Sequence, residues 1–129
     1  MGHKKLYTTS VTTTFRAGHQ LKFSASAEPY HIHDWLVEAA VSGEELDNNG
    51  MLFDFNKLKK ILDEIVSPFN DKKLEDLQCF KNMNTSAENI AKYIFGQIKQ
   101  RLPINVSPLY TEVTEAAGCK AKYGEKVSI

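Results

Sequence analysis

The sequence predicts an α+β protein in which two helices cover one face of an antiparallel sheet. Alternating apolar and polar residues predict strands near both ends of the chain, and two central segments repeat apolar residues at helical spacing. Strands that come in consecutive pairs favour antiparallel pairing, with the helices on one side. We expect the order ββααββ in a single domain spanning residues 1–129, the usual outcome for this length.

The first pair of strands is expected at residues 6–19 and 31–42. In both segments apolar side chains recur at every second position, and in the first segment β-branched threonines alternate with them. The polar, proline-containing stretch 20–30 is expected to connect them, and Asp47–Gly50 is the clearest turn signal after them. The predicted apolar faces are Val11, Phe15, Ala17 and His19 in the first strand and Trp35, Val37, Ala39 and Val41 in the second.

The helices are expected at 55–66 and from Thr85 to just before Pro103. Asp54 can cap the first helix, and Pro68 follows its end. Thr85 and Glu88 have the spacing of a capping box at the start of the second. Two closing strands are expected at about 109–115 and 120–127.

Composition excludes several classes of protein. The 16 basic and 16 acidic residues give no net charge, which argues against binding nucleic acid through the overall field. No window approaches eighteen consecutive apolar residues, and the first residues lack a signal peptide's apolar stretch. We therefore expect a cytoplasmic protein with no membrane partner. Cys79 and Cys119 are isolated and are expected to stay reduced, although a single disulfide remains an alternative.

Three of the four histidines fall within fifteen residues. His31 and His33 share one face of their predicted strand, and that face is apolar; His19 ends the first strand, also on its apolar face. If the two strands pair, all three imidazoles meet at one end of the sheet. Three histidines without a fourth protein ligand are typical of catalytic zinc sites. The alternative is that these are ordinary polar residues beside a loop.

Two carboxylates stand near this predicted site. Glu28 lies three residues before His31, in the loop that would overhang a metal, where it could act as a general base. Its alternative is a solvated loop residue. Glu115 shares the apolar parity of Val113, and a buried carboxylate needs donors, such as a ligand ring edge with two adjacent N–H groups. Its alternative is exposure at a frayed strand end.

Six pieces of the chain resemble, in order, motifs of the 6-pyruvoyltetrahydropterin synthase / 6-carboxytetrahydropterin synthase family. The resemblance covers nearly the whole chain. The first piece is similar to the family's Phe-x-Ala-x-His-x-Leu, the second to its His-Gly-His, and the fourth to its Asn-Pro-Thr-x-Glu-Asn helix start. The pieces are Phe15–Leu21, His31–His33, Gly50–Phe55, Asn84–Asn89, Val113–Glu115 and Tyr123.

This resemblance implies a T-fold whose subunits assemble into barrels, commonly a homohexamer made of two trimers, with sites at subunit interfaces. It implies that His19, His31 and His33 bind Zn²⁺ and that Glu115 anchors a pterin ring. Ser86 and Ala87 match positions that contact the pterin and could do so through main-chain groups. The implied substrate is 7,8-dihydroneopterin triphosphate, and Lys22 is one candidate for binding its phosphates.

Departures from the family pattern indicate a particular branch. Ala27 stands where the synthases have a catalytic cysteine, and Asn70-Asp71 stands where they have an Asp-His pair. Ile32 replaces the glycine between the two histidine ligands. Glu28, however, fits the spacing Glu-x-x-His-x-His of a variant that resembles a folate-pathway enzyme.

We therefore expect a lyase that uses Glu28 as its catalytic base. Its reaction would cleave the C1′–C2′ bond of the substrate and release 6-hydroxymethyl-7,8-dihydropterin. Synthesis of 6-pyruvoyl- or 6-carboxytetrahydropterin is the alternative within the family. A non-catalytic paralogue that binds a pterin or a metal is the alternative of another class.

Overall fold

The computed structural model describes residues 6–125 and has the predicted order ββααββ. Three short 3₁₀ helices, η1 (Ser67–Phe69), η2 (Leu74–Asp76) and η3 (Gln78–Phe80), lie between the two α-helices. The main elements are β1 (Tyr7–His19), β2 (His31–Gly43), α1 (Phe55–Val66), α2 (Ala87–Lys99), β3 (Ser107–Ala116) and β4 (Cys119–Tyr123).

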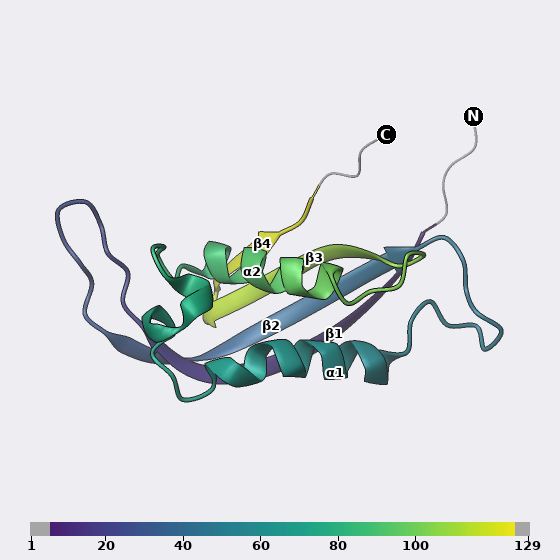
Figure 1. Cartoon of the computed structure of the whole chain (residues 1–129), viewed down its shortest axis with the longest axis horizontal. Coiled ribbons are helices and arrows are strands. Elements are labelled where there is room, and N and C mark those ends of the chain that lie inside the picture. The colour runs from purple at the N-terminus through teal and green to yellow at the C-terminus, as the bar shows by residue number, and fades with distance from the viewer. Residues whose placement is uncertain (1–5, 126–129) are drawn as a thin grey trace.

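The four strands form one antiparallel sheet in the order β1-β2-β3-β4, so every strand pairs with its neighbour in sequence. Both helices lie on the same face of this sheet (Figure 1), with α1 against β1 and α2 against β3 and β4. The 20–30 connection projects beyond one end of the sheet. The predicted α+β class is confirmed.

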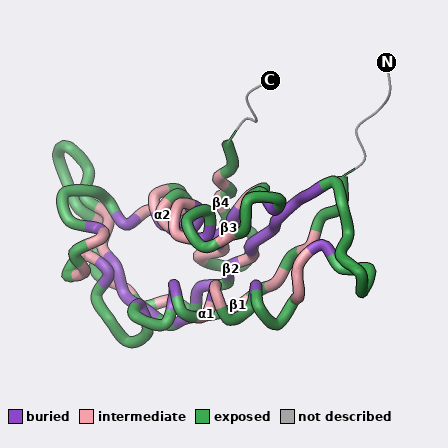
Figure 2. Tube along the Cα trace, turned by 45° about the vertical axis from the view of Figure 1, so that its right-hand side comes forward, coloured by how far each residue is buried: buried purple, intermediate pink, exposed green. Residues whose placement is uncertain are grey.

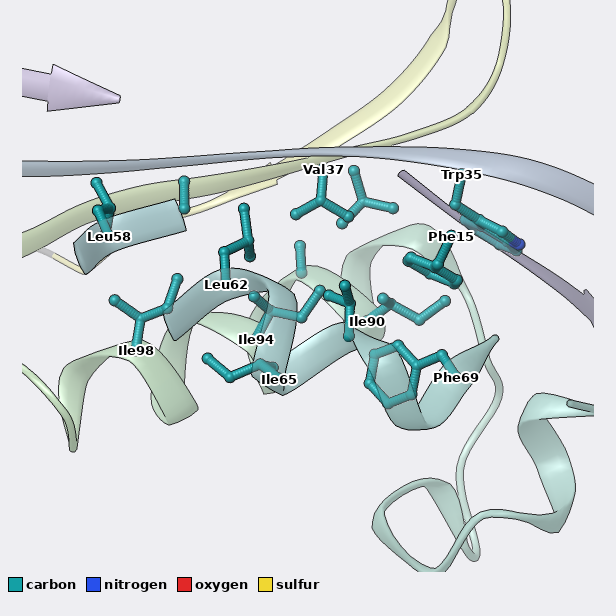
Figure 3. Close-up of a cluster of buried hydrophobic side chains, with 14 of the residues drawn as sticks. Phe15, Trp35, Val37, Leu58, Leu62, Ile65, Phe69, Ile90, Ile94 and Ile98 are labelled. Atoms are coloured by element: carbon teal, nitrogen blue, oxygen red, sulfur yellow. The ribbon is translucent and has the colours of Figure 1, made fainter. Parts of the chain in front are cut away.

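The hydrophobic core lies between the sheet and the two helices (Figure 3). The predicted apolar face of β2 is buried from Trp35 to Val41, although Ala40 on the opposite face is buried as well. Exposure is greatest in the loops (Figure 2). Phe15 stacks on Trp35 with ring centroids 5.8 Å apart. The helices contribute the buried residues Leu58, Leu62, Ile65, Val66, Ile90, Ala91, Ile94, Phe95 and Ile98.

The start of α2 differs from its prediction. Its N-cap is Ser86, whose hydroxyl accepts a hydrogen bond from the amide of Asn89 at 3.2 Å. The predicted capping box between Thr85 and Glu88 is wrong, because the Thr85 hydroxyl is fully buried and donates to Oε1 of Glu75 at 2.6 Å. The residue that looked like a helix cap therefore belongs to a different network.

The other helix and strand boundaries agree more closely. Asp54 caps α1 by accepting from the Asn56 amide at 2.8 Å, and α1 ends at Val66 before the proline-containing η1. β3 begins two residues earlier than predicted, at Ser107. β4 ends at Tyr123, four residues short of the expected end at 127, which lies outside the described residues.

The two cysteines are free thiols, so the alternative of a disulfide is wrong. Cys79 is partly buried and Cys119 is exposed. Neither helix in residues 6–125 is long and apolar enough to cross a membrane.

Candidate metal centre

The antiparallel register of β1 and β2 brings the three histidines together. His19, the last residue of β1, pairs with His31, the first of β2, and Ala17 pairs with His33. The imidazole centroids lie 4.6 Å (His19–His31), 5.5 Å (His19–His33) and 4.3 Å (His31–His33) apart. His19 is fully buried and the other two are partly exposed, so the cluster is accessible to solvent beside His31 and His33.

Main-chain carbonyls fix the ring orientation of two of these histidines. Nδ1 of His19 donates to the Thr85 carbonyl at 2.7 Å, and Nδ1 of His31 donates to the Pro29 carbonyl at 2.8 Å. Because a carbonyl only accepts, the proton of the neutral ring lies on Nδ1 and Nε2 keeps its lone pair. This is the usual arrangement behind histidines that ligate a metal through Nε2.

The three Nε2 atoms converge on Glu115 at the end of β3. Oε1 of Glu115 lies 2.6 Å from Nε2 of His19, 3.5 Å from that of His31 and 3.2 Å from that of His33. One ligand atom from each of the four residues lies within 4.8 Å of the other three. Glu115 therefore lies beside the histidines rather than at an exposed strand end, which was the alternative.

This donor set fits a divalent cation. Nε2 of His33 is buried and has no hydrogen-bond partner of good geometry among the described residues, although it faces the centre of the cluster. Burial lowers the pKa of His33, which favours the neutral imidazole that ligates metals. The hydrogen bond to the Pro29 carbonyl raises the pKa of His31, with burial opposing it.

Glu28 lies beside the cluster, and not in solvent as its alternative required. Its Oε1 accepts from the Leu21 amide at 3.1 Å and lies 3.6 Å from Nε2 of His31 and 3.9 Å from Nε2 of His19. The loop folds back on itself to hold it there, since the Glu28 amide donates to the Leu21 carbonyl and the Gln20 side chain donates to the Glu28 carbonyl.

The remaining predicted residues lie outside the group of four possible metal ligands. Ser86 and Ala87 form the start of α2, and the Ser86 hydroxyl is used as the helix cap. Lys22 lines a neighbouring cavity of about 410 Å³. Asn70 accepts from the Arg16 amide at 3.1 Å, and Asp71 lines a separate cavity of about 170 Å³ with Tyr30, so neither belongs to the histidine cluster.

Two residues of the site were missed from the sequence. The carbonyl of Thr85 orients His19, and the carboxylate of Glu75 accepts from the Thr85 hydroxyl. Burial works to raise the pKa of Glu75, but hydrogen bonds from Thr85 and from the Gln20 amide outweigh it and hold that pKa below its usual value. Only the position of Thr85 before a helix start signalled a role, and nothing in the sequence distinguished Glu75 from a surface glutamate.

The family model described as 6-pyruvoyl tetrahydropterin synthase matches residues 8–126 of the chain. The chain belongs to this family. The resemblance seen in the sequence is thereby confirmed. Members of the 6-pyruvoyl tetrahydropterin synthase family act on small pterin molecules, and the His–Glu cluster is where this chain could bind a metal.

Named relatives within the family differ in activity. A putative 6-carboxy-5,6,7,8-tetrahydropterin synthase of Archaeoglobus fulgidus is 30% identical over 92 residues, covering 70% of this chain and 75% of the relative. A dihydroneopterin monophosphate aldolase of Pyrococcus furiosus is 33% identical over 93 residues, covering 72% and 75%. The 6-pyruvoyl tetrahydrobiopterin synthase of Homo sapiens is 33% identical over 78 residues, covering 59% and 54%.

Solved structures of the family have the same fold. The 6-pyruvoyl tetrahydropterin synthase of Caenorhabditis elegans superimposes with a TM-score of 0.81 at 21% identity, covering 98% of this chain and 100% of that one. The enzyme of Plasmodium vivax gives 0.79 at 17% identity, covering 95% and 99%. The T-fold arrangement of four antiparallel strands and two helices is therefore shared across the family.

Proposed function

We propose that this protein is a metal-dependent lyase that cleaves the side chain of a dihydroneopterin phosphate and releases 6-hydroxymethyl-7,8-dihydropterin. The observation that carries the proposal is the position of Glu28, whose Oε1 lies within 4 Å of Nε2 of both His19 and His31. A carboxylate at that distance can take a proton from a substrate hydroxyl held against the histidine cluster. The name of the Pyrococcus furiosus aldolase supports this reaction class.

The proposed metal ligands are Nε2 of His19, His31 and His33, and the proposed ion is Zn²⁺. A divalent ion bound there supplies Lewis acidity, which lowers the pKa of substrate hydroxyls and orients the side chain. Three imidazoles leave coordination positions open for substrate. The buried Nε2 of His33 supports the assignment, because it makes no hydrogen bond of good geometry among residues 6–125 although Oε1 of Glu115 lies 3.2 Å away.

The cleavage is a retro-aldol step in which Glu28 acts as base. The carboxylate of Glu28 takes the proton of the C2′ hydroxyl, and the C1′–C2′ bond breaks as C2′ becomes an aldehyde. The electron pair of that bond passes through C1′ into the pterin ring, and C1′ then takes a proton to become the hydroxymethyl group. The phosphate leaves on the two-carbon aldehyde. No thiol is needed, which agrees with Ala27 at the position of the synthase cysteine.

Glu115 is proposed to anchor the pterin. Its carboxylate offers two oxygens to adjacent ring N–H groups, a charge-assisted pair that fixes the ring relative to Glu28. Main-chain groups of Ser86 and Ala87 at the start of α2 are proposed to contact the same ring. Both sets of groups adjoin the histidines, since Thr85 joins the start of α2 to His19.

Synthesis of a 6-carboxy- or 6-pyruvoyltetrahydropterin is the second candidate. The name of the Archaeoglobus fulgidus relative favours it. Two residues argue against it. Ala27 stands in place of the synthase cysteine, and the Asn70 side chain accepts a hydrogen bond from the main chain of β1.

Product analysis separates these candidates. Metal-loaded protein is incubated with dihydroneopterin monophosphate and, separately, with the triphosphate, and the products are identified by mass spectrometry. We expect 6-hydroxymethyl-7,8-dihydropterin together with glycolaldehyde phosphate or triphosphate. A pyruvoyl or carboxy product would assign a synthase, and retained pterin binding without turnover would assign a non-catalytic binding protein.

A further inference from the structure

Glu75, in η2 between the two α-helices, lies behind the histidine cluster and makes two strong hydrogen bonds. Its Oε1 accepts from the Thr85 hydroxyl at 2.6 Å and from the Gln20 amide at 2.8 Å. Its Oε2 is buried and has no partner among the described residues. Burying a carboxylate with one unpaired oxygen costs folding free energy unless its negative charge interacts favourably with a neighbouring group.

One of these hydrogen bonds leads to a proposed metal ligand. Thr85 is fully buried, and its carbonyl accepts the Nδ1 proton of His19 at 2.7 Å. The Thr85 hydroxyl, bound to Glu75, fixes the residue that carries this carbonyl. The path Glu75–Thr85–His19 therefore sets the direction of the Nε2 lone pair of His19.

The other hydrogen bond leads to the proposed base. The Gln20 amide is held by Glu75, while the Gln20 side chain donates to the Glu28 carbonyl at 2.8 Å. The next amide, that of Leu21, donates to Oε1 of Glu28 at 3.1 Å. One carboxylate thus fixes the segment that carries both the ligand His19 and the contacts of Glu28.

We infer that Glu75 is a positioning residue that holds His19 in its metal-binding orientation through Thr85. The inference rests on the proposed metal site and adds a residue that does not touch the metal. Hydrogen-bond partners behind a metal ligand change metal affinity by about 10- to 100-fold when they are removed. Glu75 also supplies a negative charge behind the histidines, which favours a cation at their centre.

The test measures Co²⁺ affinity by competition with a chelator, and the ligand field by the Co²⁺ absorption spectrum, in the full-length protein. The variants are Glu75→Gln, Thr85→Val and the double variant. We expect each single variant to bind Co²⁺ about tenfold more weakly, with a shifted spectrum. We expect the double variant to bind Co²⁺ no more weakly than the single variant with the lower affinity, because the Glu75 charge and the Thr85 hydroxyl act through one path.

Two controls isolate the effect. Asp63→Asn alters a threonine–carboxylate pair of the same 2.6 Å length, Thr13–Asp63, which lies between β1 and α1 away from the histidines. Thr85→Ser keeps the hydroxyl and the carbonyl. We expect both controls to bind Co²⁺ within about twofold of the unaltered protein. If Glu75→Gln fails to fold, the comparison of Thr85→Val with Thr85→Ser still tests the inference.

The inference is overturned if Glu75→Gln or Thr85→Val binds Co²⁺ as tightly as its control, or if the two losses multiply in the double variant. A failure of the underlying metal site has a different signature. In that case the unaltered protein itself binds no Co²⁺, which removes both the site and the inference.

Discussion

Glu115 has a carboxylate oxygen within 3.5 Å of Nε2 of all three histidines, a position that suits either a pterin anchor or a fourth metal ligand. As a pterin anchor, Glu115→Gln should raise KM by about 10- to 100-fold through the loss of charged hydrogen bonds and leave Co²⁺ affinity unchanged. Steady-state kinetics and chelator competition on the same preparation check this. A loss of Co²⁺ affinity comparable with the loss of a histidine ligand would make Glu115 a metal ligand instead.

Trp35, the single tryptophan of the chain, reports on the same site. Its ring lies 4.8 Å from that of His19 and 5.6 Å from that of His33, and its Nε1 donates to the Ala17 carbonyl. Adding Cu²⁺ should quench its fluorescence and saturate at one equivalent. Unchanged fluorescence, or quenching that continues beyond one equivalent without saturation, would contradict a single ion bound beside these rings.

At the residue scale, the sequence predicts which face of the sheet a side chain occupies when that face depends only on the alternation along a strand. The alternation in the sequence of β1 and β2 predicts that His19, His31 and His33 share one face, and the strand register agrees. Thr85 and Glu75 could not be found this way, because the hydrogen bonds of Thr85 join the start of α2 to Glu75 in η2, 10 residues away, and to His19 in β1, 66 residues away. Local spacing carries no information about such contacts.

At the scale of single elements, the start of α2 depends on one side chain. Ser86→Ala should lower the free energy of unfolding by about 1 kcal/mol through loss of the N-cap hydrogen bond. Ser86→Asp should restore most of that loss, and urea denaturation measures both. If Glu88→Ala destabilised the protein as much as Ser86→Ala, the capping box predicted from the sequence would be present after all.

The uncovered face of the sheet contains a coupled pair between β2 and β3. The Tyr110 hydroxyl donates to Glu38 at 2.5 Å, which raises the pKa of Tyr110 to about 12. The bond stabilises the neutral phenol, so its contribution to stability is complete below about pH 10, the ordinary tyrosine value, and is lost as pH rises to about 12.

Glu38→Gln should therefore move the Tyr110 titration down toward its ordinary value, as followed by the NMR shift of the Tyr110 ring carbons. Glu112→Gln is the matched control, since Glu112 pairs across the sheet with Glu38 but mainly contacts Lys120 and Lys122. A Tyr110 midpoint that stays near 12 in Glu38→Gln would show that the hydrogen bond is not the cause.

The boundaries of α1 and β3 differ in how closely the sequence predicts them. α1 was predicted to the residue, because Asp54 and Pro68 mark its ends chemically. β3 begins earlier than predicted because its ladder with β2 continues through Pro108, which pairs with Val41 next to a register shift. A proline normally interrupts a strand, and only the partner strand shows that this one is accommodated at an irregular position.

At the scale of the whole molecule, the open sheet indicates assembly. Within residues 6–125, main-chain hydrogen bonds cover the outer edge of β1 only near Arg16 and Gly18, where Asp71 and Lys72 bond to it. β4 forms the opposite edge. Exposed strand edges invite pairing with further chains, and closure into a barrel removes them.

These edges support the assembly that the family resemblance implies, and we propose a homohexamer built from two trimers. Native mass spectrometry should give about six times the 14.6 kDa of the single chain. Proline substitution at Ser10 in β1, whose amide has the outward parity of the Arg16 and Gly18 amides, should reduce assembly while the monomer remains folded by circular dichroism. A monomeric mass at the concentrations used for catalysis would contradict the proposed assembly.

The most direct test of the proposed reaction compares the unaltered protein with Glu28→Gln at equal metal content. Metal analysis confirms the loading, and mass spectrometry measures 6-hydroxymethyl-7,8-dihydropterin formed from dihydroneopterin monophosphate. With Glu28 as the base, the substitution should reduce product formation by at least about 100-fold while metal content stays the same. Product formation at an unchanged rate in Glu28→Gln would contradict the role of Glu28.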